Sequence, residues 1–206
     1  MVDEVSYFDS GRWPALADGG GSTLELIDPC SDNTVGDAWA ASDESIRAEW
    51  QNYVYRASGA EPPGSNNPDN WKEFLIGFLD EGEALIDDLS VREDPDGSNR
   101  ELIVNGTFEA DEPGQQPDDW RLLGTHKLSR VVKDPEGNGN VLHLIATGEM
   151  THTYNNGSTT VSGNRRIDSN SEYEIRFRAK WLAGSPQLNT RLYLNRAART
   201  HILSQP

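Results

Sequence analysis

Cysteine is almost absent from this chain: Cys30 is the only one among 206 residues. A single cysteine excludes an internal disulfide and leaves no cysteine-based metal cluster. Cys30 follows Pro29 in the turn-like sequence Asp-Pro-Cys-Ser-Asp. We therefore interpret it as a small loop residue rather than a nucleophile.

Long hydrophobic runs are also missing. No stretch of eighteen apolar residues occurs, so the sequence predicts no membrane span. The first residues, Met-Val-Asp-Glu-Val, lack the basic and apolar regions of a secretory signal. The chain starts inside a strand-like pattern and stops abruptly after Ser-Gln-Pro, so we expect a piece of a longer protein with neighbouring domains.

Basic residues are scarce: 18 Lys and Arg stand against 34 Asp and Glu, a net charge of −16. This balance argues against a nucleic-acid partner. Residues 165–206 hold eight basic and three acidic residues, a net of +5, so the rest carries −16 − 5 = −21. This basic third either binds an anionic or hydrogen-bond-rich partner or scatters its charge over solvated faces.

Familiar catalytic motifs are missing as well. There is no Gly-x-Ser-x-Gly, P-loop or His-Glu-x-x-His, and any acid pair drawn from so many carboxylates would be arbitrary. The sequence therefore names no catalytic residue. The four histidines form no dense motif, although two or three could meet in space: His126, His143, His152 and His201.

What is present is a β pattern broken by Gly and Pro turns. The clearest alternation predicts that Tyr173, Ile175, Phe177, Ala179 and Trp181 share one face of a strand. A second strand, residues 188–194, follows a Gly-Ser-Pro-Gln turn. Further strands are expected at the segments 24–27, 50–56, 73–79, 83–91, 120–123, 128–132, 141–145 and 158–161.

Residues 102–109 read Leu-Ile-Val-Asn-Gly-Thr-Phe-Glu, and Trp120 follows after a Pro/Gly/Asp stretch. The segment resembles the opening strand of jelly-roll carbohydrate-binding modules. Residues 82–91 resemble the closing strand of the same modules but come before the opening one. The resemblance implies an all-β jelly-roll sandwich over residues 50–206, circularly permuted, or the tail of one module followed by the front of another.

The first forty residues carry a second resemblance. Their ordered series, which includes Ser-Gly-Arg-Trp-Pro, Leu-Glu-Leu-Ile-Asp-Pro and Trp-Ala-Ala-Ser, is similar to the C-terminal part of a lamin-tail domain. That family is a small immunoglobulin-like sandwich. We expect a partial lamin-tail-like segment at residues 1–42 and a linker at 43–49. The combination resembles large secreted bacterial proteins, often with CotH-like regions.

The jelly-roll resemblance implies a structural Ca²⁺ between the opening strand and the closing aspartate-containing strand. Thr107, Glu109 and Asp87 or Asp88 match the positions that donate oxygen in that family. Adjacent residues of a strand point to opposite faces, so only one of the two aspartates is expected to reach the ion. We expect Thr107, Glu109 and Asp88. The alternative is that both aspartates close a hairpin.

The polar face of the last two clear strands is the candidate sugar-binding surface. Arginine offers a fixed fork of donors that also suits a uronate carboxylate, and an aromatic ring can stack on a sugar. The alternative is a solvated face on which Glu174 pairs with a nearby arginine. The candidate residues are Arg176, Arg178, Lys180, Asn189, Arg191 and Tyr193, with Tyr154 or Trp120 as further rings.

These patterns predict a non-catalytic polysaccharide-binding module of a larger secreted or surface protein. One alternative is a structural or adhesion spacer that binds no sugar. Another is a small metal-dependent enzyme on a jelly-roll scaffold. An aromatic-lined groove with arginines would favour the first, a flat charged face the second, and a three-histidine cluster the third.

Overall fold

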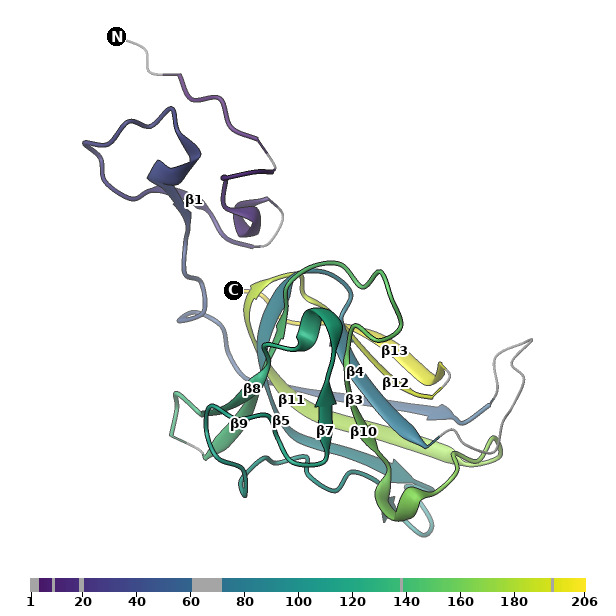
Figure 1. Ribbon diagram of the computed structural model, residues 1–206. Coiled ribbons are helices and arrows are strands. Elements are labelled where there is room, and N and C mark those ends of the chain that lie inside the picture. The colour runs from purple at the N-terminus through teal and green to yellow at the C-terminus, as the bar shows by residue number, and fades with distance from the viewer. Residues whose placement is uncertain (1–3, 9, 19–20, 61–71, 138, 194) are drawn as a thin grey trace.

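In the computed structural model, the chain forms two packed antiparallel sheets preceded by a small two-stranded ribbon (Figure 1). The structure describes residues 4–8, 10–18, 21–60, 72–137, 139–193 and 195–206. Within these ranges, no helix is long and apolar enough to cross a membrane. The expectation of an all-β sandwich is confirmed. The helical segments are 3-10 turns: η1 (Ala15–Ala17), η2 (Gly36–Ala38), η3 (Gly124–His126) and η4 (Ser162–Asn164).

The N-terminal ribbon pairs β1 (Leu24–Leu26) with β2 (Trp39–Ala41), with Leu26 opposite Trp39. The ribbon projects from the sandwich (Figure 1). It touches the sandwich near Gly21, where an added Cβ would lie 3.0 Å from the ring of Trp181. The segment compared with a lamin-tail domain therefore has one short antiparallel pair of strands among its described residues.

The first sheet of the sandwich has five strands in the order β13-β12-β4-β10-β7. All neighbours are antiparallel. The bounds are β13 (Arg196–Ile202), β12 (Gln187–Leu192), β4 (Glu73–Phe78), β10 (Gly157–Thr160) and β7 (Trp120–Leu122).

The second sheet has the order β3-β11-β5-β9-β8, and a short β6 pairs with β5 outside this path. The bounds are β3 (Gln51–Ser58), β11 (Glu172–Gly184), β5 (Gly82–Glu93), β9 (Asn140–Ala146), β8 (Arg130–Lys133) and β6 (Arg100–Glu101).

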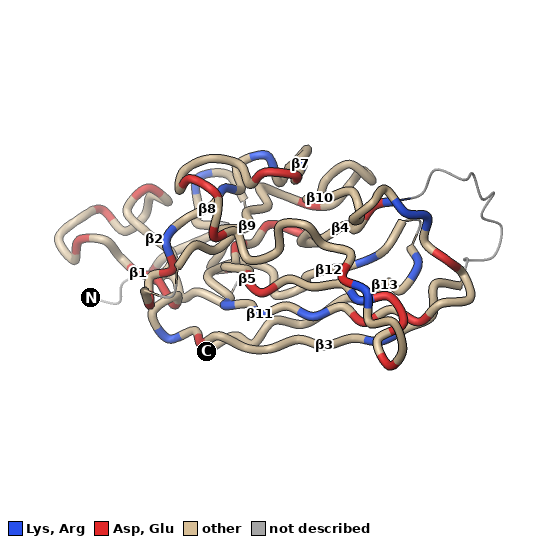
Figure 2. The backbone as a smooth tube through the Cα atoms, turned by 90° about the horizontal axis from the view of Figure 1, so that it is seen from below, with Lys and Arg blue, Asp and Glu red and all other residues tan. Residues whose placement is uncertain are grey.

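Figure 2 shows basic and acidic positions interspersed along the backbone, not split into a basic and an acidic half.

The core lies between the inner faces of the two sheets. The alternation predicted in β11 is confirmed, because its five apolar side chains are each at most 2% exposed. From the opposite sheet, His201 of β13 packs edge-on against Phe177, with ring centroids 5.0 Å apart. The outward faces of β11 and β12 consequently lie on opposite sides of the sandwich.

The segment 102–109 is not a regular strand, contrary to the sequence prediction. One side chain explains this: Oε1 of Glu101 accepts hydrogen bonds from the backbone amides of Val91, Leu102 and Ile103, at 3.0–3.1 Å. Side-chain bonding of this kind competes with ladder formation. Phe108 then takes a left-handed conformation, with φ 58°.

The segment nevertheless lies against β5. Leu102 donates its amide to Val91 O at 2.8 Å, and Leu89 donates its amide to Gly106 O at 2.9 Å. The segment that resembles the opening strand of a jelly-roll module therefore lies beside β5, which holds the segment that resembles the closing strand, but it forms no strand of the sheet itself.

Candidate ligand-binding pocket and cation site

Four outward-facing side chains form a row across the five-stranded sheet. Arg191 of β12 lies opposite Leu75 of β4, Leu75 lies opposite Ser158 of β10, and Ser158 lies opposite Arg121 of β7. The strand alternation that sends their neighbours into the core points these four outward. The row forms the floor of a pocket of about 210 Å³.

Two tyrosines stand at this pocket. Tyr193 follows β12, and Tyr154 comes from the loop between β9 and β10. The ring of Tyr154 is 67% exposed. The remaining lining is mostly polar: Glu73, Leu123, Thr153, Asn156 and Asn195.

The loop that carries Tyr154 is held by local bonds. Tyr154 donates its amide to Nδ1 of His152 at 3.2 Å, and the two rings stack with centroids 5.2 Å apart. Nδ2 of Asn156 donates to the carbonyl of Thr153 at 2.5 Å. These contacts order the loop while leaving one tyrosine ring open to solvent.

The two arginines of the row differ in their partners. Arg121 donates to Oε1 of Glu73 at 2.8 Å and to the hydroxyl of Thr160 at 3.1 Å. Arg191 is half-buried, and no described residue accepts a hydrogen bond from its guanidinium or forms an ion pair with it. Burial lowers the pKa of Arg191 below its ordinary value, although the group stays charged at neutral pH.

The structure brings together only part of the predicted sugar-binding surface. Arg191, Tyr193 and Tyr154 line the pocket. Asn189 shares their sheet, but its Nδ2 lies 3.3 Å from both Arg199 O and Thr200 Oγ1 and does not line the pocket.

Arg176 and Arg178 were wrongly grouped with these residues. They belong to β11, in the other sheet. Arg176 pairs there with Glu174, as the alternative reading of this face anticipated. Lys180, also on β11, pairs with Glu136 at 3.0 Å. The prediction failed because β11 and β12 are separated by a short turn, which ordinarily marks a hairpin but here carries the chain from one sheet to the other.

Trp120 is also unsuited to stack on a sugar. It is 6% exposed and points into the core, with its ring centroid 6.0 Å from that of Phe108 and 6.3 Å from that of Phe74. Its Nε1 donates to Asn105 O at 2.7 Å. Leu75, Ser158 and Arg121 of the pocket were missed in the sequence, because their strands gave no sign of which would be neighbours.

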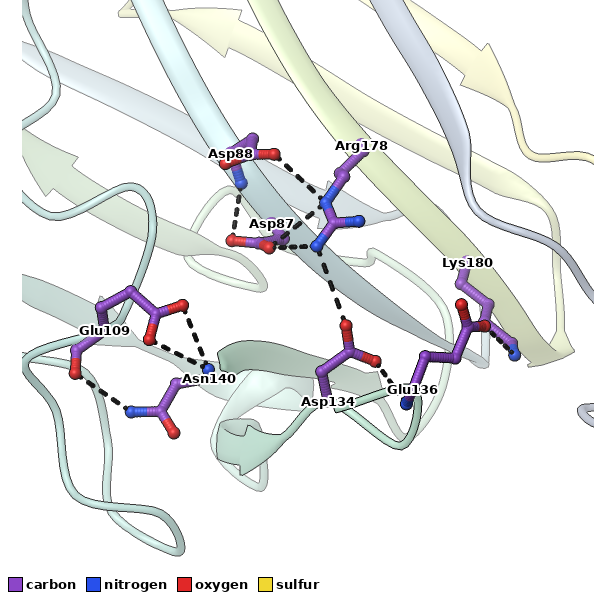
Figure 3. Close-up of polar contacts among 8 residues, drawn as sticks. All are labelled: Asp87, Asp88, Glu109, Asp134, Glu136, Asn140, Arg178 and Lys180. Atoms are coloured by element: carbon purple, nitrogen blue, oxygen red, sulfur yellow. Dashed lines mark hydrogen bonds and ion pairs between the residues drawn. The ribbon is translucent and has the colours of Figure 1, made fainter. Parts of the chain in front are cut away.

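Asp88, predicted to bind calcium, instead contacts Arg178, with 3.2 Å between Oδ2 and Nε (Figure 3). Oδ2 of Asp87 accepts from Nη2 of the same guanidinium at 2.6 Å. Both carboxylates reach one arginine because a register shift and the left-handed φ of 50° at Asp88 interrupt the alternation. Asp134 completes the cluster at 3.8 Å from Arg178.

Glu109 lies apart from this cluster, beside Asn140 (Figure 3). Its two carboxylate oxygens accept from the backbone amide of Asn140, at 3.2 and 3.3 Å. Nδ2 of Asn140 donates to three converging backbone carbonyls, those of Phe108, Glu109 and Asp111, at 2.9–3.3 Å. The predicted sharing of one cation by Glu109 and Asp88 is not supported by these pairings, and the Thr107 side chain is exposed to solvent.

The surroundings of Glu109 do suit a calcium ion. Oδ1 of Asn140 is buried and has no hydrogen-bond partner. Turning this amide by 180° would direct Oδ1 toward the three carbonyls, an all-oxygen arrangement of the kind Ca²⁺ prefers. Across the described residues, no group of three or more His, Cys, Asp and Glu side chains is placed to hold a metal, so backbone oxygens would have to complete this site.

Three of the four histidines each bond to a separate partner. Nε2 of His126 accepts from the Phe78 amide at 2.9 Å, and His143 pairs with Glu83 at 2.8 Å. Nε2 of His201 contacts the hydroxyl of Thr190 at 2.9 Å. The described part of the chain therefore offers no three-histidine centre.

Comparison of the chain with protein-family models, curated proteins and solved structures gave no match.

Proposed function

We propose that this protein is a non-catalytic carbohydrate-binding module of a larger secreted or surface protein, and that the sugar binds in the pocket on the outer face of the five-stranded sheet. The observation that carries the proposal is the meeting of Tyr154, Tyr193 and Arg191 at one concave site. Aromatic faces supply stacking area for a sugar ring, and the guanidinium supplies planar donors.

The size of the pocket supports a short contact with a polymer. Its volume of about 210 Å³ is below the roughly 300–1,000 Å³ of typical small-molecule clefts. One sugar residue in the pocket, with the rest of the chain crossing the surface, fits this size better than an enclosed ligand. A module of this kind would hold its parent protein to a polysaccharide.

The test is a glycan array followed by titration calorimetry with wild type, Tyr154→Ala and Tyr193→Ala. Tyr154→Ala removes an exposed ring and leaves the core intact, so we expect binding to weaken about tenfold. Arg130→Ala, an exposed position on β8 in the other sheet, is the control and should bind like wild type. Absence of binding to every neutral and acidic glycan would overturn the proposal and favour the spacer alternative.

We also propose that a structural Ca²⁺ is held by the Glu109 carboxylate, the side-chain oxygen of Asn140 and the carbonyls of Phe108, Glu109 and Asp111. The support is that three carbonyls converge on the side-chain amide of Asn140, whose buried Oδ1 has no hydrogen-bond partner and would face them once the amide is turned. The ion would fix the loop after the segment 102–109 without taking part in sugar contact.

A further inference from the structure

We infer that the pocket selects an acidic sugar, a uronate, and that Arg191 binds the carboxylate of this sugar. The inference rests on the proposed function, since it names the class of sugar that the pocket takes. It follows from the contrast between two arginines that face the same pocket.

Arg121 is already neutralised. Glu73 occupies its guanidinium at 2.8 Å and Thr160 takes a further bond. Such a paired group can donate to a neutral hydroxyl, but it has little remaining attraction for an anion.

Arg191 has no such partner among the described residues. A half-buried charge without a counter-ion destabilises the ligand-free protein. Binding of an anion removes this penalty. A carboxylate can accept two parallel bonds from a guanidinium, and such charge-assisted bonds are about twice as strong as neutral ones. Among the described residues, Arg191 thus lacks the carboxylate partner that a uronate supplies.

The charge of the pocket points the same way. The ionised groups among its described lining residues are Glu73, Arg121 and Arg191, a net of +1 in a chain of net charge −16. This local positive charge would discriminate against the cationic amino sugars and favour the acidic ones. Stacking on the tyrosine rings does not depend on the charge of the sugar. Arg191 therefore determines the selectivity for acidic sugars.

The experiment compares short oligosaccharides of galacturonate, glucuronate, mannuronate and guluronate with their methyl esters. Esterification removes the charge while keeping the ring and its hydroxyls. Calorimetry at 0.15 M salt limits the repulsion between the acidic protein and the ligand, because the Debye length is then about 8 Å. We expect at least one acid to bind at least about tenfold more tightly than its ester.

The variants are Arg191→Gln and, as a control with the same loss of charge, Arg130→Gln. Arg191→Gln should bind acid and ester equally, while Arg130→Gln should keep the preference. Unchanged thermal unfolding midpoints would show that both variants fold. Equal binding of acid and ester by wild type, or a preference that survives in Arg191→Gln, overturns this inference while the sugar-binding proposal stands. Absence of binding to all acids, esters and neutral glycans overturns both.

Discussion

The imidazole of His126 accepts a hydrogen bond from the backbone amide of Phe78, with 2.9 Å between Nε2 and N. The proton of the neutral ring must then be on Nδ1, which lies 3.1 Å from the hydroxyl of Thr125. A protonated ring could not accept this bond. The fold therefore holds His126 neutral, and burial lowers its pKa to about 4.

Stability should consequently fall in mild acid. Burial, together with the nearby charge of Arg199, also lowers the pKa of His201 to about 4. Below the unfolded-state pKa of about 6.5, the unfolded chain binds protons that the folded chain does not, so the loss runs from pH 6.5 down to 4. Each histidine contributes up to about 3 kcal/mol of this loss. Urea unfolding between pH 7 and 4 measures it.

His126→Gln keeps an acceptor for Phe78 and should flatten the pH dependence. His152→Gln, at an exposed position, is the control and should leave the slope as in wild type. Equal slopes for wild type and His126→Gln would contradict the assignment.

Removing Arg178 should be costly. Its guanidinium lies 4.4 Å from the ring centroid of Trp50 and faces three aspartates, of which Asp87 is 3% and Asp134 is 4% exposed. Arg178→Met would leave these carboxylates buried without a cation, at a cost of about 3 kcal/mol. Chemical denaturation would measure the loss.

Arg176→Met is the matched control, because its partner Glu174 keeps a second arginine, Arg56. We expect a loss below about 1 kcal/mol. If the two variants lost equal stability, the cluster around Arg178 would have no special role.

Gly106 should not tolerate a side chain. A Cβ there would lie 1.9 Å from Leu89 O, so Gly106→Ala must push apart the contact that ties the segment 102–109 to β5. We expect a loss of about 3 kcal/mol. At Gly137 the added Cβ meets open space, and only the φ of +81° opposes it. Gly137→Ala should therefore cost about 1 kcal/mol. Thermal unfolding of both variants would distinguish a steric cause from a backbone one.

Calcium bound at Glu109 and Asn140 should stabilise the fold. At a concentration one hundred times the dissociation constant, the ion would add about 2.7 kcal/mol, which raises the unfolding midpoint by about 5–10 °C. Chelator should reverse the shift. Glu109→Gln should abolish it, whereas Asp88→Asn should keep it. A shift that depends on Asp88 instead would restore the ligand set predicted from sequence.

Some of this structure was predictable because local pattern decides it. The alternation in β11 predicted which face is buried, since a strand buried on one side must alternate. Tyr154, proposed from the sequence as a ring for sugar stacking, does line the pocket.

The rest depends on contacts that a pattern does not reveal. Within the predicted strand at 102–109, the carboxylate of Glu101 accepts from the amide of Ile103 and shares the amide of Leu102 with Val91 O. Gly184, with φ 75°, is the last residue of β11 and directly precedes the turn that leads the chain into the other sheet. In both places the backbone or side chain bonds to a residue distant in sequence. Glu101 accepts from the amide of Val91, and Ser185, in the turn after β11, donates its amide to Glu81 O.

The pocket floor affects how binding experiments on this protein are interpreted. It is the row of Arg191, Leu75, Ser158 and Arg121. Its four members come from four strands that are far apart in the sequence, β12, β4, β10 and β7, and they align only when these strands have paired. No peptide excised from the chain would recreate the pocket. A sugar titration therefore reports the completeness of folding, and substitutions that affect recognition will be scattered along the gene rather than gathered in one motif.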